Sequence, residues 1–468
     1  MKILYILTAL GVISLLAELF KFKKLLLPIV LLGLLGAIAA GIKDWNSNIY
    51  YYNNMLTFDN YALLFSMVLC SIAFLWFLMA SDGMLANEST RTDYYALTLF
   101  ALCGAVVMAS YSNMVMLFLG IEILSIPIYV LAGSRKNDLA SNESALKYFL
   151  MGAFATCFLL FGIALIYGAT GTFDISTLGT YLDSPSALQS WRGPGGITLL
   201  SAGILMMLIG MCFKVAAVPF HFWTPDVYEG APTQVTAYMA TIVKTAAFAA
   251  FLRLFMTCFT SFESLWSDVV WVIAAVSILL GNLTAIYQSN VKRMLAYSSI
   301  AHAGYMLLGI LSGGKLAAGG VLYYAAAYSV ATIAAFTILS AIEKNGSALT
   351  FDSFKGFAKN NKLAAFAMSV AMLSLAGIPP LAGFFGKYFL FSAALENGYV
   401  WLVLIAALGS LIGVYYYLKI IITMYADNNT EENAVAINLT TAQQVALALC
   451  VLLSFILGFF PDLIIRLI

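Results

Sequence analysis

The stretch GMCFKVAAVPFHFWTPDVYEGAP, Gly210–Pro232, follows an apolar run that begins near Ile197 and interrupts it with charge and proline. Lys214 stands where a plain membrane helix has an apolar residue, and Pro219 and His221 follow it closely. A proline inside a helix removes one backbone hydrogen bond and crowds the preceding turn, so we expect the helix to break here. The freed carbonyl groups need water, side chains or ions, which makes the break a candidate site.

The composition around this stretch is that of an integral membrane protein. Of the 468 residues, 62% are hydrophobic and 10% are charged, whereas roughly a quarter of the residues in a soluble domain carry charge. Lys plus Arg number 23 and Asp plus Glu number 22, so there is no basic excess that would favour a nucleic-acid partner. The chain is therefore expected to lie in a lipid bilayer and to bind no nucleic acid.

The cysteines and histidines do not form a metal-ligand pattern. The cysteines stand singly in apolar runs, no CxxC pair occurs, and the chain has two histidines. Zinc or iron-sulfur ligation by this chain is therefore not expected. We interpret the six cysteines as small buried hydrophobic residues: Cys70, Cys103, Cys157, Cys212, Cys258 and Cys450.

Apolar runs of membrane-spanning length recur along the whole chain. A hydrocarbon core of about 30 Å needs about 20 mostly apolar residues, and the first run has no cleavage site after it, so it is predicted to be retained. The pattern predicts about 14 transmembrane helices, near 3–20, 25–42, 60–81, 93–112, 114–133, 145–169, 196–220, 235–257, 268–287, 294–312, 316–342, 363–395, 399–425 and 441–462.

The distribution of basic residues between the loops predicts the orientation, because basic loops stay on the cytoplasmic side. One side would carry Lys21, Lys23, Lys24, Arg91, Arg135, Lys136, Lys292, Arg293, Lys344, Lys355, Lys359 and Lys362. The other would carry Lys2, Lys43, Arg192, Lys315 and Arg466. The first side is therefore predicted to be cytoplasmic, with both termini on the outer, periplasmic side.

Several charged residues fall within the predicted spans, where each costs about 2.5 to 3.5 kcal/mol at a helix centre. Arg253 and Lys419 lie near span ends and are interpreted as snorkelling side chains. Lys147 follows Glu143 by one turn, so an exposed ion pair and a functional role are both open for it. The residues near mid-span are predicted to be functional: Glu122, Lys214 and Lys244.

A second interrupted span carries SLAGIPPLAGFFGKYF, in which Gly377, Pro379 and Pro380 precede Lys387. Paired interrupted spans in two halves of a chain are the sequence sign of an inverted-repeat transporter, although two unrelated proline kinks are the alternative. The predicted fold is an all-α polytopic membrane protein with two inverted five-helix repeats and broken helices 7 and 12. The predicted units are a three-helix segment at 1–92, repeats at 93–257 and 268–425, and a last helix at 441–468.

The buried charges suggest proton transfer without a cofactor. Desolvation disfavours a charged lysine and a nearby carboxylate restores the charge, so movement of Glu122 relative to Lys214 would switch the lysine between holding and releasing a proton. His221 is predicted either to relay protons or to bond a carbonyl group of the broken helix. His302 lies among small residues and is predicted to be a packing histidine that secondarily assists the site.

Three segments, FKVAAVPFHFWTPDVYEGAP, VKRMLAYSSIAHAGYMLLG and AGIPPLAGFFGKYFLF, resemble the antiporter-like membrane subunits of respiratory complex I, the proton-pumping NADH-quinone oxidoreductase. The resemblance covers nearly the whole chain and is greatest to the N-type subunits, the bacterial counterparts of mitochondrial subunit 2. In that family a glutamate and several lysines form a polar axis at mid-membrane. The residues that match this axis are Glu122, Lys147, Lys214, Lys244 and Lys387, and His221 matches the histidine of the family's seventh-helix motif.

The resemblance implies a proton-translocating subunit of the bacterial inner membrane that has no redox centre of its own. NADH, flavin, iron-sulfur clusters and quinone would belong to the complex, and its other membrane and peripheral subunits would be the partners. A subunit of a multisubunit cation/proton antiporter is the alternative within the superfamily. A structural scaffold, whose buried charges only hold helices together, is the alternative outside it.

Overall fold

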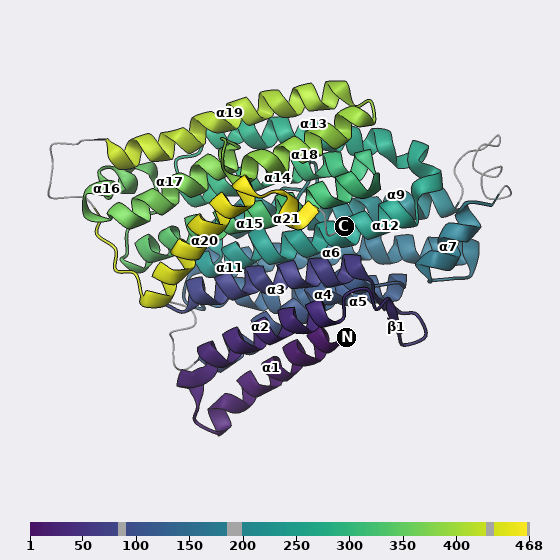
Figure 1. The fold of residues 1–468 in the computed structure, drawn as a ribbon, viewed down its shortest axis with the longest axis horizontal. Coiled ribbons are helices and arrows are strands. Elements are labelled where there is room, and N and C mark those ends of the chain that lie inside the picture. Colours follow the sequence, from purple (N-terminus) through teal and green to yellow (C-terminus); the bar gives the residue numbers. More distant parts are fainter. Residues whose placement is uncertain (83–89, 185–198, 427–434, 466–468) are drawn as a thin grey trace.

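The computed structural model describes residues 1–82, 90–184, 199–426 and 435–465, and nearly all of its regular structure is helical. The long helices lie side by side, with α1 and α2 at one edge of the bundle and α19 at the other (Figure 1). The elements of the first part are α1 Lys2–Leu19, η1 Lys23–Leu25, α2 Leu26–Lys43, β1 Ile49–Tyr51, β2 Leu56–Phe58, α3 Asn60–Ala80, α4 Arg91–Ser110, α5 Met114–Ala132, α6 Leu139–Thr170, α7 Ile175–Leu182, α9 Leu199–Lys214, α10 Trp223–Gly230, α11 Thr233–Tyr238, the π-helix η3 Met239–Val243 and α12 Lys244–Thr257.

The second part continues the bundle. Its elements are η4 Thr260–Phe262, α13 Glu263–Ile286, α14 Val291–Ser312, α15 Gly314–Lys344, η5 Phe351–Phe354, α16 Phe357–Asn360, α17 Lys362–Ala376, α18 Ala382–Glu396, α19 Val400–Tyr425, α20 Thr441–Phe459 and α21 Asp462–Ile465. The strands β1 and β2 form one antiparallel hairpin in which Ile49 pairs with Phe58. The all-α polytopic fold class predicted from the sequence is confirmed.

Twelve helical segments in the described residues are long and apolar enough to cross a membrane. They correspond to twelve of the predicted spans, and the remaining two, the seventh and the twelfth, are the interrupted helices. The sixth helix begins at Leu139 rather than near 145, because Asp138 caps it by accepting a hydrogen bond from the backbone of Ala140. The predicted start of the seventh span at 196, and the charges of Arg192 and Arg466, lie outside the described residues. The exact number of crossings and the inverted repeats stay predictions.

Both predicted helix breaks are present. The seventh helix stops at Lys214 and resumes at Trp223, and the twelfth stops at Ala376 and resumes at Ala382. A residue with positive φ lies in each break, Ala216 at 61° and Gly377 at 83°. A right-handed helix cannot continue through a left-handed residue, so each break is fixed by the backbone itself.

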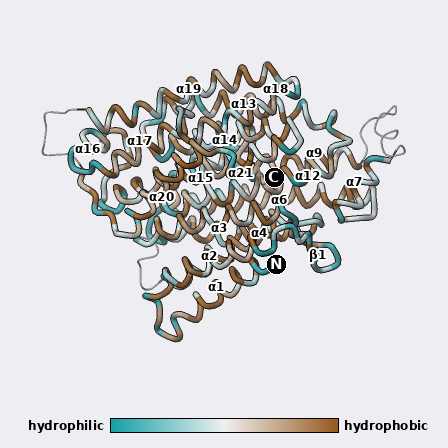
Figure 2. The backbone as a smooth tube through the Cα atoms, in the orientation of Figure 1, coloured by the Kyte–Doolittle hydropathy of each residue, from teal (hydrophilic) through white to brown (hydrophobic). Residues whose placement is uncertain are grey.

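The centre of the bundle is formed by the segment from α11 to α12 together with α14 and α15, whose spans are almost wholly buried within the chain. The helices α1, α2 and α19 expose far more apolar surface, as expected of helices that face lipid or other subunits. Hydrophobic residues cover the long helices, and hydrophilic ones gather toward the ends near α16 and β1 (Figure 2). The central helices also contain several of the charged residues described next.

Candidate functional site

Lys214 is the last residue of α9, and its side chain is buried at the break. Its Nζ donates a hydrogen bond of 3.0 Å to Oγ of Ser125 on α5. After the break turns through Ala216, the backbone N–H of Val218 donates to Oγ of Ser277 on α13. A cation at a helix C-terminus is favoured by the helix dipole, so the broken end helps to hold Lys214 in an apolar interior.

Glu122 lies on α5 one turn before Ser125, on the same face of the helix. Its Oε1 is buried and has no hydrogen-bond partner. Glu122 and Lys214 do not form an ion pair in this structure, and Lys214 donates to Ser125 one turn further along α5. Glu122 as a whole is partly buried, and a buried carboxylate oxygen without a hydrogen-bond partner is costly. The predicted tuning of Lys214 by Glu122 stays a prediction.

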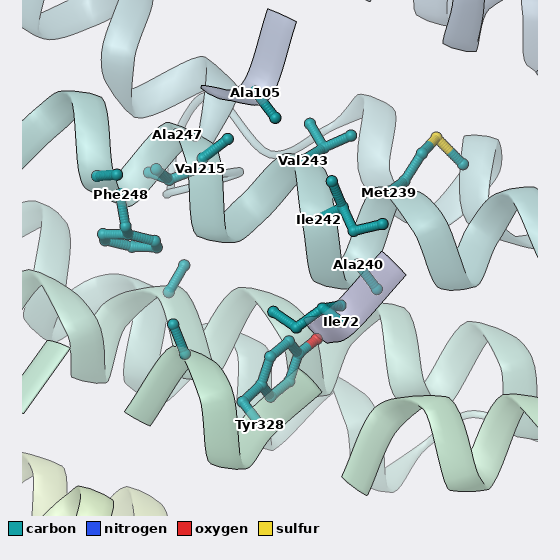
Figure 3. Packing of buried hydrophobic residues seen from close by; sticks show 14 of the residues in the cluster. Ile72, Ala105, Val215, Met239, Ala240, Ile242, Val243, Ala247, Phe248 and Tyr328 are labelled. Atoms are coloured by element: carbon teal, nitrogen blue, oxygen red, sulfur yellow. The ribbon is translucent and has the colours of Figure 1, made fainter. Parts of the chain in front are cut away.

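Lys244 begins α12 directly after the π-helix η3 and is 3% exposed. Its Nζ donates to the carbonyl oxygen of Ser299 on α14 at 2.6 Å and to Oγ of the same residue at 2.5 Å. The ring of Tyr328 on α15 lies 5.9 Å away. Figure 3 shows apolar side chains of this region, among them Val243 and Phe248 of η3 and α12, together with Tyr328 of α15. A lysine of the first predicted repeat is thus bound by residues of the second.

Lys387 lies on α18 beside the second break and is 6% exposed. Its Nζ donates to the carbonyl oxygens of Ala376 at 2.8 Å and Leu375 at 3.3 Å, and to Oγ of Ser410 on α19 at 2.8 Å. The ring of Tyr305 lies 5.1 Å from Nζ. The carbonyl groups freed by the break are therefore satisfied by the lysine that follows it, as the prolines of this span predict.

His302 is hydrogen-bonded through both ring nitrogens. Nδ1 lies 2.6 Å from the hydroxyl of Tyr324, and Nε2 lies 2.9 Å from that of Tyr417. Its ring also packs against Tyr328, with centroids 4.8 Å apart, and against Tyr305, with centroids 5.8 Å apart. The predicted packing role is consistent with these contacts. Because Tyr328 faces Lys244 and Tyr305 faces Lys387, His302 also lies between the two lysines.

His221 lies in the first break and is 6% exposed, and its Nδ1 has no hydrogen-bond partner. Its ring packs on Phe222 with centroids 4.7 Å apart. A buried imidazole nitrogen without a partner is costly, and a proton relay and a bonded break histidine both stay open for this residue.

Lys147 stands apart from the buried lysines, because its side chain is 39% exposed near the start of α6. It forms the predicted ion pair with Glu143 at 2.7 Å and a second with Asp226 of α10, also at 2.7 Å. Asp226 also pairs with Arg293 of α14 at 2.9 Å, and Arg293 pairs with Glu229 at 2.7 Å. The cluster lines a polar cavity of about 280 Å³.

Asp226 remains ionised at neutral pH. Burial by itself would raise the pKa of this carboxyl group, but the hydrogen bonds and charges of Lys147 and Arg293 outweigh burial and lower the pKa below its ordinary value. This acidic residue therefore acts as a fixed negative charge shared by α6 and α14.

The side chain of Arg253 is 8% exposed and pairs at 2.7 Å with Asp59, which is 34% exposed. The interpretation of Arg253 as a snorkelling side chain stays a prediction. Asp59 precedes α3 and is distant in sequence, so no local pattern indicated the pair. Lys419 packs its ammonium 4.3 Å from the ring centre of Phe351.

Sequence reasoning missed the partners of the charged residues. Ser125 could have been noticed, because it lies three residues after Glu122 and polar residues inside spans tend to bond across helices. The other partners had no local signal: Asp226, Arg293, Ser299, Tyr305, Tyr328 and Ser410. Within the described residues, no three His, Cys, Asp or Glu side chains lie close enough together to hold a metal ion.

Buried lysines, two broken helices and a bundle of membrane-spanning length define the class of antiporter-like ion-translocating membrane proteins. Residues 111–413 match the family model described as NADH:quinone oxidoreductase/Mrp antiporter, TM. The chain belongs to this family, and the predicted family and fold class are confirmed.

Relatives named NADH-quinone oxidoreductase subunit N resemble the chain over its full length. The protein from Cytophaga hutchinsonii is 42% identical over all of this chain and 99% of its own. That from Trichlorobacter lovleyi is 41% identical over 98% of this chain and 94% of its own. A chain of Thermus thermophilus respiratory complex I with bound aureothin superposes with a TM-score of 0.83 at 34% identity, covering 99% of this chain and 98% of that one.

A chain of the Mrp complex from Dietzia sp. DQ12-45-1b has a TM-score of 0.85 at 21% identity, covering all of this chain and 96% of that chain. At that identity the likeness shows the fold alone.

Proposed function

We propose that the chain is the N subunit of a bacterial NADH-quinone oxidoreductase and moves protons across the inner membrane along its buried lysines. NADH oxidation and quinone reduction would take place on other subunits, which would hold the flavin, iron-sulfur clusters and quinone. The other membrane and peripheral subunits would be its partners. The full-length similarity to subunits of that name supports this assignment over a cation/proton antiporter subunit.

The observation that carries the proton-transfer role is common to three lysines. Each buried ammonium group is bound by a serine hydroxyl from another helix: Lys214 by Ser125, Lys244 by Ser299 and Lys387 by Ser410. None of the three lies within 4 Å of a carboxylate among the described residues. This lysine–serine hydrogen bond recurs at lysines on three separate helices, so we interpret it as a common feature of the proposed proton path.

A serine partner suits a group that gains and loses a proton. A hydroxyl can accept a hydrogen bond from a charged ammonium group and donate one to a neutral amine. A fixed carboxylate would instead hold the lysine in its charged form. These lysines can therefore change charge without losing their hydrogen bond, which a structural scaffold would not need.

The path we propose begins on the cytoplasmic side at Lys147 and its ion pairs. It continues through Lys214 and Lys244 to Lys387, with Glu122 and His221 assisting at the first break and His302 between the last two lysines. The proposed orientation places both termini on the outer side. We further propose inverted repeats at 93–257 and 268–425, supported by α4 packing on α5 and α6 on α9 in one half, and by α13 packing on α14 and α15 on α17 in the other.

The assignment is tested by purifying the tagged chain with its companions from membranes. We expect NADH-oxidising and quinone-reducing subunits in the assembly, and NADH-driven acidification of vesicles that contain it. If only antiporter subunits purify with the chain, and a sodium or potassium gradient drives proton movement, the chain would belong to the antiporter class instead.

A further inference from the structure

A second polar cavity of about 610 Å³ lies at the opposite end of α6 from Lys147. It is bordered by the β1–β2 hairpin, by the start of α7 and by the last turns of α12. Figure 1 shows β1 and α7 at the same end of the bundle. The loop charges predict that this end faces the outer side of the membrane.

The cavity runs from an exposed rim to a buried floor. Asn54, Thr177 and Asp183 at the rim are exposed, whereas Thr57 and Ser112 are buried and bonded to each other. Arg253 also lines the cavity and is almost wholly buried. The cavity is therefore a polar recess that reaches into the bundle from its surface.

The guanidinium group of Arg253 has donors that the protein leaves unused. One nitrogen donates to Asp59 at 2.7 Å, and the ring of Tyr61 lies 4.8 Å from the guanidinium carbon. The Nε of Arg253 is buried without a hydrogen-bond partner. Polar side chains line the recess from its rim to its floor, and a roomy cavity that offers several polar partners holds water, so the recess is expected to be hydrated.

Beyond Arg253 the interior becomes apolar toward the membrane centre. Residues 246–252 of α12 are buried and uncharged, and the hydroxyls of Tyr61 and Tyr111 donate to the carbonyl oxygens of Ala249 and Ala250. Lys244 lies nine residues before Arg253, about 13 Å along the helix at 1.5 Å per residue. Along α12, Arg253 therefore stands between the recess and Lys244.

We propose that this recess is a water-filled vestibule open to the outer side, and that Arg253 at its floor is a fixed positive charge that stops protons and other cations from re-entering. A buried positive charge in a narrow aqueous path raises the energy of an approaching cation. The aspartate of the Arg253–Asp59 pair is the more exposed member, so the positive end is the deeper one. The proposal rests on the proposed proton transport, because a seal is needed only where a gradient is built.

The test is the passive proton leak of vesicles that contain the whole complex, measured without NADH after an imposed pH step. Arg253→Gln should raise the leak by about tenfold, because the positive charge is lost while a polar side chain remains. Arg253→Lys and Asp59→Asn should stay as tight as the parent, because both keep the positive charge. A tight Arg253→Gln complex would overturn the proposal, and so would an Asp59→Asn complex as leaky as Arg253→Gln, which would show that the pair only supports the fold.

A second measurement keeps Arg253 in place, in case its variants do not assemble. Thr57→Cys on the vestibule floor should react with a membrane-impermeant thiol reagent added from the outer side, in excess of the labelling of the parent chain. Labelling no greater than that of the parent would show that the recess is closed to water and would overturn the proposal. NADH-driven pumping by the parent complex tests the proposed function separately. Failure of the vestibule proposal is therefore not mistaken for failure of the proposed proton transport.

Discussion

The Nζ of Lys387 donates a 2.8 Å hydrogen bond to the carbonyl oxygen of Ala376, the last residue before the break in the twelfth helix. The lysine and the break are therefore one unit. The break supplies oxygen atoms for a buried cation, and the cation satisfies carbonyl groups that have lost their helical partners. Loss of a proton from Lys387 would therefore change the charge of the lysine and the hydrogen bonding of the carbonyl groups at the break together.

Lys387→Met should lower NADH-driven proton transport more than Lys387→Glu does. A glutamate still titrates, whereas a methionine of similar length cannot bind a proton and offers no hydrogen-bond donor to the carbonyl groups at the break. The measurement is vesicle acidification at matched expression. A methionine variant as active as the parent would show that Lys387 only anchors the helix.

Gly377→Ala tests the geometry of that same break. Gly377 has a φ of 83°, and an added Cβ would lie 2.9 Å from Cδ of Lys387. The left-handed backbone alone costs an alanine about 1 to 2 kcal/mol, so the complex should inactivate at a lower temperature and pump less. Gly168→Ala, in α6 with open space around its Cα, is the matched control and should leave both unchanged. Equal behaviour of the two variants would contradict the proposed role of the break.

Lys214→Ala should strongly reduce proton pumping while the complex still assembles. The substitution removes the titrating group, but Ala216 and Pro219 still break the helix. Pumping is measured as NADH-driven acidification, and assembly as the amount of complex that purifies with the tagged chain. Lys136→Ala, which removes an exposed lysine from the loop before α6, is the control expected to pump normally. Normal pumping by Lys214→Ala would instead favour the scaffold alternative.

Glu122→Gln should impair pumping about as severely as loss of Lys214, and Glu122→Asp should impair it less. Glutamine keeps the length of the side chain but removes the charge that would tune Lys214, whereas aspartate keeps the charge on a shorter side chain. Rates of vesicle acidification compare the two directly. If the two variants pump equally well, the charge of Glu122 has no part in the mechanism.

The elements that sequence predicted best are those with local causes. The spans follow from the length of apolar runs, because each must cross the same hydrocarbon thickness. The breaks at Pro219 and at Pro379 and Pro380 follow from the missing backbone donors. The charged side chains could be recognised because a charge inside an apolar membrane helix raises the free energy of insertion. Fold class and the candidate lysines could therefore be predicted before any contact was known, and the family was predicted from the resemblance of three sequence segments.

The chain by itself determined where the helices, breaks and buried charges lie, whereas their partners were decided only by the tertiary structure. Lys244 binds Ser299 across 55 residues, and Arg253 pairs with Asp59 across 194. Hydropathy and proline act on the segment that contains them, so they can be read locally. A hydrogen-bond partner depends on which helix faces pack together, and that packing is fixed by the whole bundle at once.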